Sequence, residues 1–414
     1  MIISVPIQDA IVFVESTGIR DSVRQCVRDS NIKTLHVAAN IDECSDLLQK
    51  HETALLIIDW QPPATVSLLE FSKKMSGDFL PRPTFLISVT VSQELVALAV
   101  DQQVTRFHQG SLTKQDLNDH IQFLQNYAED SHQQDYRLKF EDAIKKKKLA
   151  MYQDSLNILL EIEEEYGLKS ETLAEKTNCH ILLENWEDAR NTAKKLMSSF
   201  PENPRGRHLL GRCFLKQGLY EEASNILQEA QILNPWHSDR IVELGQALLK
   251  SGKTAAAQKN FDKALELQSD KTEAIIGKSQ CHMLQDSIND ALTLLKNIRE
   301  PREIASIFND SAVLCIRQLK YDQALSLYRT ALSFLSDKPR FQARIFFNMG
   351  LGYYKSGQKD DALEAFESAL QKDPSFTSAS HNSQILSKAS TQKSGTNRSQ
   401  DIITKFEDFD DEGF

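Results

Sequence analysis

Several kinds of segment are missing from the sequence, and each absence removes a class of protein. No run of about 18 or more apolar residues occurs, so insertion into a membrane is not expected. The opening residues, MIISVPIQDA, lack a basic stretch ahead of a long apolar one, so we expect no secretory signal and a cytoplasmic location. No Gly-rich phosphate loop, GxSxG or HExxH motif is present, and we therefore do not expect an enzyme.

The sequence also has few cysteines, and its net charge is negative. The six cysteines show no CxxC spacing, so we expect neither a disulfide framework nor a zinc site of cysteines, and we expect reduced, mostly buried thiols. The net charge of −10 disfavours nonspecific binding to nucleic acid or anionic lipid. No helix-turn-helix pattern with a basic helix occurs, so direct binding to nucleic acid is not expected.

Residues 1–127 alternate short apolar runs with amphipathic stretches. A length of 414 residues predicts two or more domains, and this segment is the first. Continuous apolar strands that alternate with helices predict a parallel five-stranded sheet covered on both faces, a doubly wound, flavodoxin-like α/β domain. The predicted strands are residues 10–14, 34–38, 54–58, 84–88 and 104–108.

Polar residues stand at the carboxyl ends of several of these strands. Asp59 ends the third strand, in the stretch TALLIIDWQPP, while Glu15 and Ser16 end the first and Ser88 ends the fourth. The carboxyl ends of parallel strands meet at one edge of a sheet, so these residues are predicted to share a crevice.

In order and spacing this segment resembles a response-regulator receiver domain of two-component signalling. The resemblance implies that Asp59 is the phosphoacceptor for a histidine kinase, that Glu15 and Asp59 bind Mg²⁺, and that Ser88 is the switch residue. Pro63 matches the proline that the family places four residues after the phosphoacceptor. The family's lysine after the fifth strand is missing, because Gln109 or Gly110 stands in its place.

Two interpretations of Asp59 therefore stay open. In the first, the aspartate forms an acyl phosphate with the help of Mg²⁺. In the second, the segment is a pseudo-receiver whose Asp59 caps a strand and binds backbone amides.

A period of 34 residues dominates the rest of the chain. Equivalent alanines are spaced by 34 residues in three successive steps, then by 33 and by 38. Small residues also recur twelve positions before most of these alanines, where two helices of a repeat are predicted to cross closely. The alanines are Ala189, Ala223, Ala257, Ala291, Ala324 and Ala362.

This pattern resembles the tetratricopeptide repeat (TPR). It implies about seven helix pairs over residues 136–385, after a linker at 128–135, stacked into an all-α solenoid with a peptide-binding groove. The groove residues alternate cations with apolar side chains, which suits an acidic peptide with hydrophobic side chains, although solvated stems on an ordinary surface are the alternative. The predicted groove residues are Arg205, His208, Arg212, Lys216, Leu249, Lys250, Arg317, Arg344, Phe347 and Tyr354.

Residues 386–414 lose the period and are predicted to form a disordered acidic tail. Its end, FEDFDDEGF, is similar to the acidic, Phe-terminated tip of bacterial single-stranded DNA-binding proteins, through Phe406, Phe409 and Phe414. The tail could recruit a further partner or dock on the chain's own groove.

Together these features predict a signalling adaptor, in which a receiver-like domain is coupled to a peptide-binding solenoid and regulated by phosphorylation at Asp59. The alternative is a scaffold of a protein complex with a pseudo-receiver and no phosphoryl chemistry.

Overall fold

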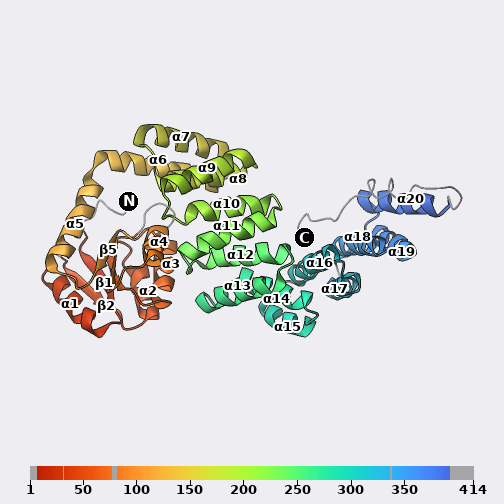
Figure 1. Cartoon of the computed structure of the whole chain (residues 1–414), viewed down its shortest axis with the longest axis horizontal. Coiled ribbons are helices and arrows are strands. Elements are labelled where there is room, and N and C mark those ends of the chain that lie inside the picture. Colours follow the sequence, from red (N-terminus) through yellow and green to blue (C-terminus); the bar gives the residue numbers. More distant parts are fainter. Residues whose placement is uncertain (1–6, 31, 77–81, 336–337, 392–414) are drawn as a thin grey trace. The chain divides into compact units, whose positions relative to one another are not determined.

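The computed structural model describes residues 7–30, 32–76, 82–335 and 338–391 (Figure 1). The chain divides into two compact units, residues 1–244 and 245–414. The first unit holds an α/β domain, called here the head domain (residues 7–129), followed by repeat helices. The second unit, where it is described, holds repeat helices.

The head domain is a five-stranded parallel sheet in the order β2-β1-β3-β4-β5. This confirms the predicted doubly wound α/β fold, with each strand within two residues of its predicted position. The strands are β1 (Asp9–Phe13), β2 (Thr34–Val37), β3 (Leu55–Asp59), β4 (Thr84–Ser88) and β5 (Arg106–Gln109).

Both faces of the sheet are covered. Along β3, Leu55 and Ile57 pack in the cluster that includes residues of α1 (Thr17–Arg28) and α5 (Lys114–Glu129). Leu56 and Ile58 point the other way and pack in a second cluster. That cluster includes residues of α2 (Ile41–Lys50), α3 (Ala64–Ser76) and α4 (Gln93–Asp101). Burial on both faces explains why the strands are continuous apolar runs.

The head domain joins the repeats without the predicted linker at 128–135. The helix α5 ends at Glu129, α6 begins at Ser131, and the Asp130 side chain between them accepts hydrogen bonds from the first backbone N–H groups of α6. The aspartate therefore caps α6 and replaces a flexible connection with a turn. The other repeat helices of this unit are α7 (Tyr152–Tyr166), α8 (Ser170–Leu182), α9 (Trp186–Ser199), α10 (Arg205–Lys216) and α11 (Tyr220–Leu233), and α12 (Ser238–Lys250) continues into the second.

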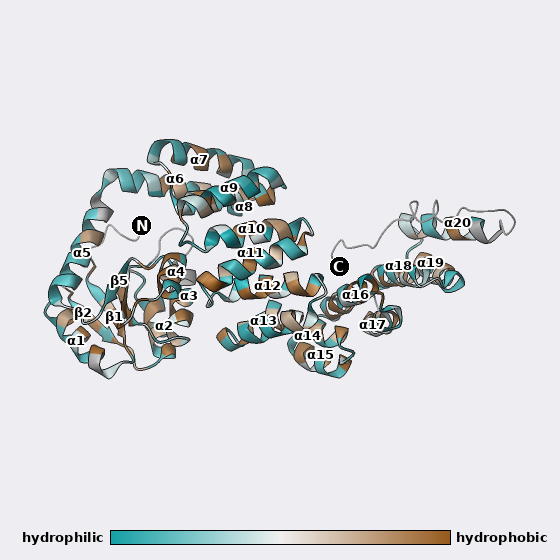
Figure 2. Cartoon of the chain, in the orientation of Figure 1, coloured by the Kyte–Doolittle hydropathy of each residue, from teal (hydrophilic) through white to brown (hydrophobic). Residues whose placement is uncertain are grey.

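Close helix crossings explain the small residues of the repeat pattern. All six equivalent alanines are fully buried. A Cβ atom added at Gly211 would lie 2.5 Å from Cγ of Leu227, and one added at Gly350 would lie 2.6 Å from Cε1 of Phe366. Figure 2 shows hydrophobic and hydrophilic residues side by side along the repeat helices, as expected for amphipathic helices.

The second unit continues the repeats to Thr391, six residues beyond the predicted end of the solenoid at 385. In the described part of the chain, α6 to α19 form seven helix pairs in sequence order, and α20 follows them. The predicted tail residues Phe406, Phe409 and Phe414 lie outside the described residues. The helices of this unit are α13 (Thr254–Leu267), α14 (Thr272–Leu284), α15 (Ile288–Leu294), α16 (Pro301–Arg317), α17 (Tyr321–Ser333), α18 (Pro339–Lys355), α19 (Lys359–Lys372) and α20 (Thr377–Thr391).

Candidate functional sites

Asp59 lies at the end of β3 with both carboxylate oxygens hydrogen bonded to backbone. Oδ1 accepts from the N–H of Glu15 and Oδ2 from the N–H of Ser16, each at 3.0 Å. The residue is only 2% exposed. The side chain therefore ties the end of β3 to the turn after β1, as the strand-capping interpretation of Asp59 requires.

The remaining side chains of the crevice do not fit Mg²⁺. Mg²⁺ prefers octahedral coordination by oxygen, usually from one or two carboxylates with several waters. Here Glu15 is exposed, Ser16 replaces a second acid, and both oxygens of Asp59 already face N–H donors. The hydroxyl of Ser88 donates to the carbonyl of Thr90 at 2.7 Å. Gln109 or Gly110 stands where the receiver family has a lysine, and neither side chain supplies a positive charge.

A second site, which the sequence analysis missed, joins the head domain to the repeats. Asp101, at the end of α4, accepts hydrogen bonds on Oδ2 from Nη2 of Arg240 at 2.8 Å and from Nδ2 of Asn234 at 2.9 Å. The side chains of Asp101 and Arg240 are 3% and 0% exposed. A charged pair this deeply buried is costly unless its hydrogen bonds are satisfied, so it requires close packing of α4 on the repeats.

Aromatic contacts extend this interface. Trp236, in the turn between α11 and α12, packs against the head-domain core. Its ring meets that of Trp60 edge to face, with centroids 6.1 Å apart. Trp60 directly follows Asp59, so the contact with the repeats reaches the rim of the crevice.

One sequence signal points to Arg240. In the 34-residue register its equivalents are Gly206 and Ala274, two small residues. An arginine at a position where the neighbouring repeats have glycine or alanine indicates that this side chain makes a contact that those repeats lack. The partner, Asp101, is 139 residues away, and no local pattern identifies it.

Polar contacts continue from this interface to two of the predicted groove residues. The ring of His237 lies 5.4 Å from that of His208, whose Nε2 lies 2.8 Å from a carboxylate oxygen of Glu243. The other oxygen of Glu243 pairs with Nε of Arg212 at 3.2 Å. Burial lowers the pKa of His237, with the charge of Asp101 opposing this shift and that of Arg240 adding to it.

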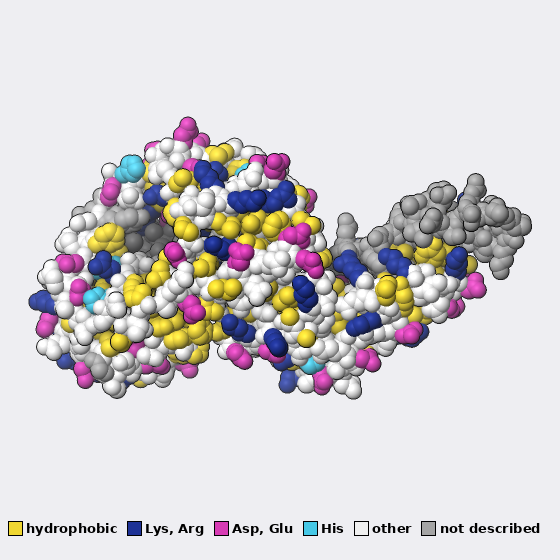
Figure 3. Space-filling model, viewed as in Figure 1, with side chains coloured by type: hydrophobic (Ala, Val, Ile, Leu, Met, Phe, Trp, Pro, Cys, Tyr) yellow, Lys and Arg dark blue, Asp and Glu magenta, His cyan; other side chains and the backbone are white. Residues whose placement is uncertain are grey.

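The predicted cations of the groove in the first unit face acidic neighbours. Nη2 of Arg205 lies 2.7 Å from Glu175, which also pairs with Lys147. Burial opposes ionisation of Glu175, but the two cations outweigh it and lower the pKa of the carboxyl. Lys216 is exposed. Figure 3 shows Lys and Arg side chains interspersed with Asp and Glu on the visible face. The positive charge predicted for the groove is thus partly neutralised from within.

Two predicted groove residues of the second unit are core residues instead. Leu249 is 2% exposed and Phe347 is 1% exposed, with the Phe347 ring 5.7 Å from that of Phe366. The prediction was wrong for both because one face of a helix was assigned to the groove without separating the side chains that turn toward the paired helix. Lys250 and Arg317 are exposed, and Arg344 and Tyr354 are half-buried.

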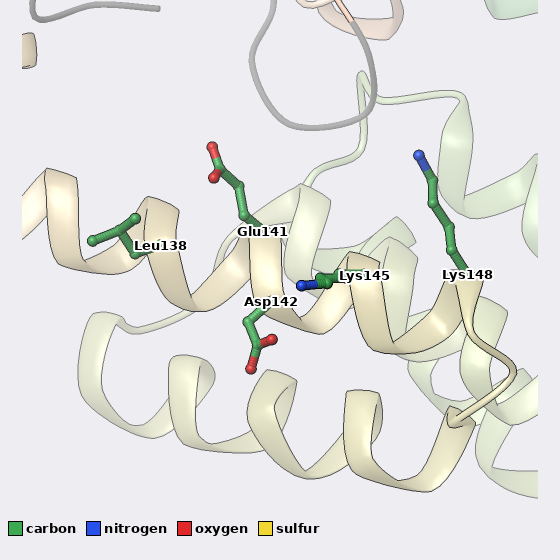
Figure 4. Close-up of a pocket in the computed structure, with 5 residues that line it drawn as sticks. All are labelled: Leu138, Glu141, Asp142, Lys145 and Lys148. Atoms are coloured by element: carbon green, nitrogen blue, oxygen red, sulfur yellow. The ribbon is translucent and has the colours of Figure 1, made fainter. Parts of the chain in front are cut away.

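A shallow pocket on α6 lacks the convergence of a binding site. Its lining residues lie along a single helix, and Figure 4 shows Glu141 and Lys148 extending to one side and Asp142 to the other.

No described helix of the chain is long and apolar enough to cross a membrane.

Comparisons with known proteins agree with the repeat geometry. Tetratricopeptide-repeat family models match residues 180–244, 248–302 and 303–375. Among curated relatives, the human protein O-mannosyl-transferase TMTC1 is 30% identical over 172 residues, covering 40% of this chain and 19% of that protein. The CTR9 homolog of Arabidopsis thaliana is 26% identical over 188 residues, covering 40% of this chain and 17% of that protein. The chain thus spans less than a fifth of either relative.

Solved structures show similar repeats at low identity. A TPR protein from Parabacteroides merdae has a TM-score of 0.45 and 15% identity, covering 61% of this chain and 99% of that one. YrrB, a TPR protein described as having an unusual peptide-binding site, has a TM-score of 0.30 and 18% identity, covering 55% of this chain and 97% of that one. From the family models and the helix pairs, residues 180–375 form tetratricopeptide repeats, and helices before and after them extend the solenoid.

Proposed function

We propose that the protein is a scaffold in which the head domain and the first repeats act as one docking block and the solenoid binds a protein partner. The observation that supports this is the buried contact of Asp101 with Arg240 and Asn234. Asp101 accepts hydrogen bonds from both repeat residues and the pair is excluded from water, so the contact requires the head domain and these repeats to pack closely. The head domain is then a fixed part of the binding platform.

The scaffold is not expected to use phosphoryl chemistry. Phosphorylation of Asp59 would have to displace at least part of two backbone hydrogen bonds, without a lysine to hold the phosphoryl oxygens. The alternative is an adaptor that a histidine kinase phosphorylates at Asp59 with Mg²⁺. One observation favours it: Asp59 and Ser88 end neighbouring parallel strands, in the arrangement that the receiver resemblance implies.

For the partner we propose an extended peptide that combines acidic and hydrophobic side chains. In the first unit the exposed Lys216 favours it, whereas Glu175 and Glu243 limit the net positive charge available there. The acidic tail, outside the described residues, is proposed to recruit a further partner.

The test is recovery of partners from source cells with the full chain as bait. Charge reversal at the exposed groove position of the first unit, Lys216→Glu, should weaken recovery of a partner that the groove of this unit binds. The matched control is Lys359→Glu, an exposed lysine at the first position of α19, a second helix of its repeat. Equal loss in the control, or undiminished recovery with the groove variant, would contradict the assignment of the groove.

A further inference from the structure

Two histidines and one aspartate form a cluster at the edge of the sheet opposite Asp59. Asp9 is the first residue of β1, His36 lies in β2, and His51 directly follows α2. Asp59 is the last residue of β3, and the strands are parallel, so the cluster and the crevice occupy opposite ends of the sheet. Figure 1 shows β1, β2 and α2 together in the head domain. Neither the receiver resemblance nor the proposed scaffold uses these residues.

The polar atoms of the cluster are close without satisfying one another. One ring nitrogen of each histidine and one carboxylate oxygen of Asp9 all lie within 4.8 Å of each other. The two imidazole rings are 4.0 Å apart between centroids. Nδ1 of His51 is 3.6 Å from Oδ2 of Asp9, which is longer than a hydrogen bond. Nε2 of His36 is buried and has no hydrogen-bond partner among the described residues. A buried polar atom in this state requires an explanation.

Buried contacts hold the three side chains in place. Asp9 and His36 lie on paired strands, since Asp9 is in register with Thr34 and Ile11 with His36. Arg82, only 4% exposed, donates from Nη2 to the carbonyl of Leu48 at 2.7 Å and from Nη1 to the carbonyl of His51 at 2.5 Å. The guanidinium of Arg82 therefore fixes the backbone at the end of α2, including the backbone of His51. Ligands on a sheet and on a fixed helix end are preorganised, which lowers the cost of binding an ion.

The donor set selects the kind of ion. Two imidazoles and one carboxylate match the nitrogen and oxygen ligands of Zn²⁺, whereas Mg²⁺ and Ca²⁺ prefer oxygen alone. Nε2 of His36 makes no hydrogen bond within the described part of the chain, and it lies in a group whose ligand atoms are within 4.8 Å of one another, so a metal could take it as a ligand. The side chains of His51 and Asp9 are 28% and 32% exposed, which leaves water access to a further coordination position.

We propose that Asp9, His36 and His51 form a three-ligand site for Zn²⁺, completed by water, which ties the end of α2 to the edge strand β2 and its neighbour β1. The bound ion would give Nε2 of His36 a partner, and the carboxylate of Asp9 would coordinate the same cation. Its role is to stabilise the head domain.

The experiment is a titration of the metal-free full chain with Zn²⁺ by calorimetry, followed by thermal unfolding and by Co²⁺ substitution, whose visible absorption reports coordination number. We expect one-to-one binding, a rise in the unfolding temperature and a four-coordinate Co²⁺ spectrum. His51→Ala should weaken binding by at least about tenfold. If that variant fails to fold, Asp9→Asn serves in its place.

The matched control is His108→Ala. His108 belongs to the same domain and also lies near a carboxylate, with Nε2 3.9 Å from Asp116, but that nitrogen is hydrogen bonded to the carbonyl of Ser111 at 3.1 Å. Its loss should leave zinc binding unchanged. Failure of the wild-type chain to bind micromolar Zn²⁺, or equal binding by His51→Ala, would overturn the proposal and leave the cluster as a contact between two tilted histidine rings beside Asp9.

Discussion

At the scale of single residues, the small residues of the repeat period are explained by the close packing of paired helices. Gly211 stands where α10 and α11 cross, and a Cβ atom there would come 2.5 Å from Cγ and 2.7 Å from Cδ2 of Leu227. Real side-chain atoms do not approach so closely, so a larger residue forces the helices apart. The sequence could therefore reveal the crossings through small residues alone.

Gly211→Ala should destabilise the first unit by about 1–3 kcal/mol through overpacking, despite the better helix propensity of alanine. The urea midpoint of the full chain and of the variant measures this. Lys216→Ala, on the exposed side of the same helix, should change it by less than about 0.5 kcal/mol. A Gly211→Ala variant as stable as the parent would show that the crossing is looser than described.

His120 gives the head domain a stability that depends on pH. Burial lowers the pKa of His120 to about 4, with a contribution from Arg106, whereas a histidine in the unfolded chain titrates near its ordinary value of 6.5. Only the unfolded chain takes up the proton as the pH falls from 6.5 to about 4, so the folded state loses stability across that window. The full effect is on the order of 3 kcal/mol.

Replacing the imidazole should flatten this dependence. His120→Gln is expected to keep the pairing with Thr105, whose Oγ1 lies 3.2 Å from Nε2, while removing the titration. Urea midpoints of parent and variant, measured between pH 7 and pH 4, should converge as the pH falls. Parallel curves would mean that His120 is not held neutral in the folded domain.

At the scale of elements, the sequence predicted what is local and missed what is distant. The strands follow from continuous apolar runs and the helix pairs from the 34-residue period. The linker was wrong because its polar residues cap and begin α6. The groove was wrong at Leu249 and Phe347 because period alone does not separate the two sides of a helix. The packing of α4 on α11 and α12 was missed because Asp101 and Arg240 are far apart in sequence.

The contact of α4 with the repeats predicts a large effect from a small change. Asp101→Asn leaves the guanidinium of Arg240 buried without its charged partner, and this should destabilise the first unit by about 3–5 kcal/mol. Equilibrium unfolding of the full chain measures the loss. Removing both charges, as in Asp101→Asn with Arg240→Met, should recover part of it, because no unpaired charge then remains buried.

An exposed pair supplies the control. Nζ of Lys278 lies 2.7 Å from Asp262, with side chains that are 27% and 41% exposed. Asp262→Asn should cost at most about 1 kcal/mol, since water screens such a pair. Equal losses for Asp101→Asn and Asp262→Asn would mean that α4 is not packed against the repeats in solution.

At the scale of the whole molecule, the two parts of the chain have different relations to function. The repeats provide the surface on which we propose that a protein partner binds, and in the first unit Glu175 and Glu243 pair with two of the predicted groove arginines. The head domain is a doubly wound parallel sheet, and Asp59 at the end of β3 accepts hydrogen bonds from two backbone N–H groups. A signalling switch would require that aspartate to exchange its partners; a scaffold requires it to keep them.

Fluorescence of the full chain, titrated with Mg²⁺ and then beryllofluoride, tests this account most directly. Trp60 follows Asp59 and touches Trp236, so its emission reports both the crevice and the contact with the repeats. An Asp59→Asn variant provides the background, including the emission of Trp186. We predict that parent and variant respond alike, with no saturable change. A saturable change in the parent that is absent from Asp59→Asn would contradict the account and establish Asp59 as a working phosphoacceptor.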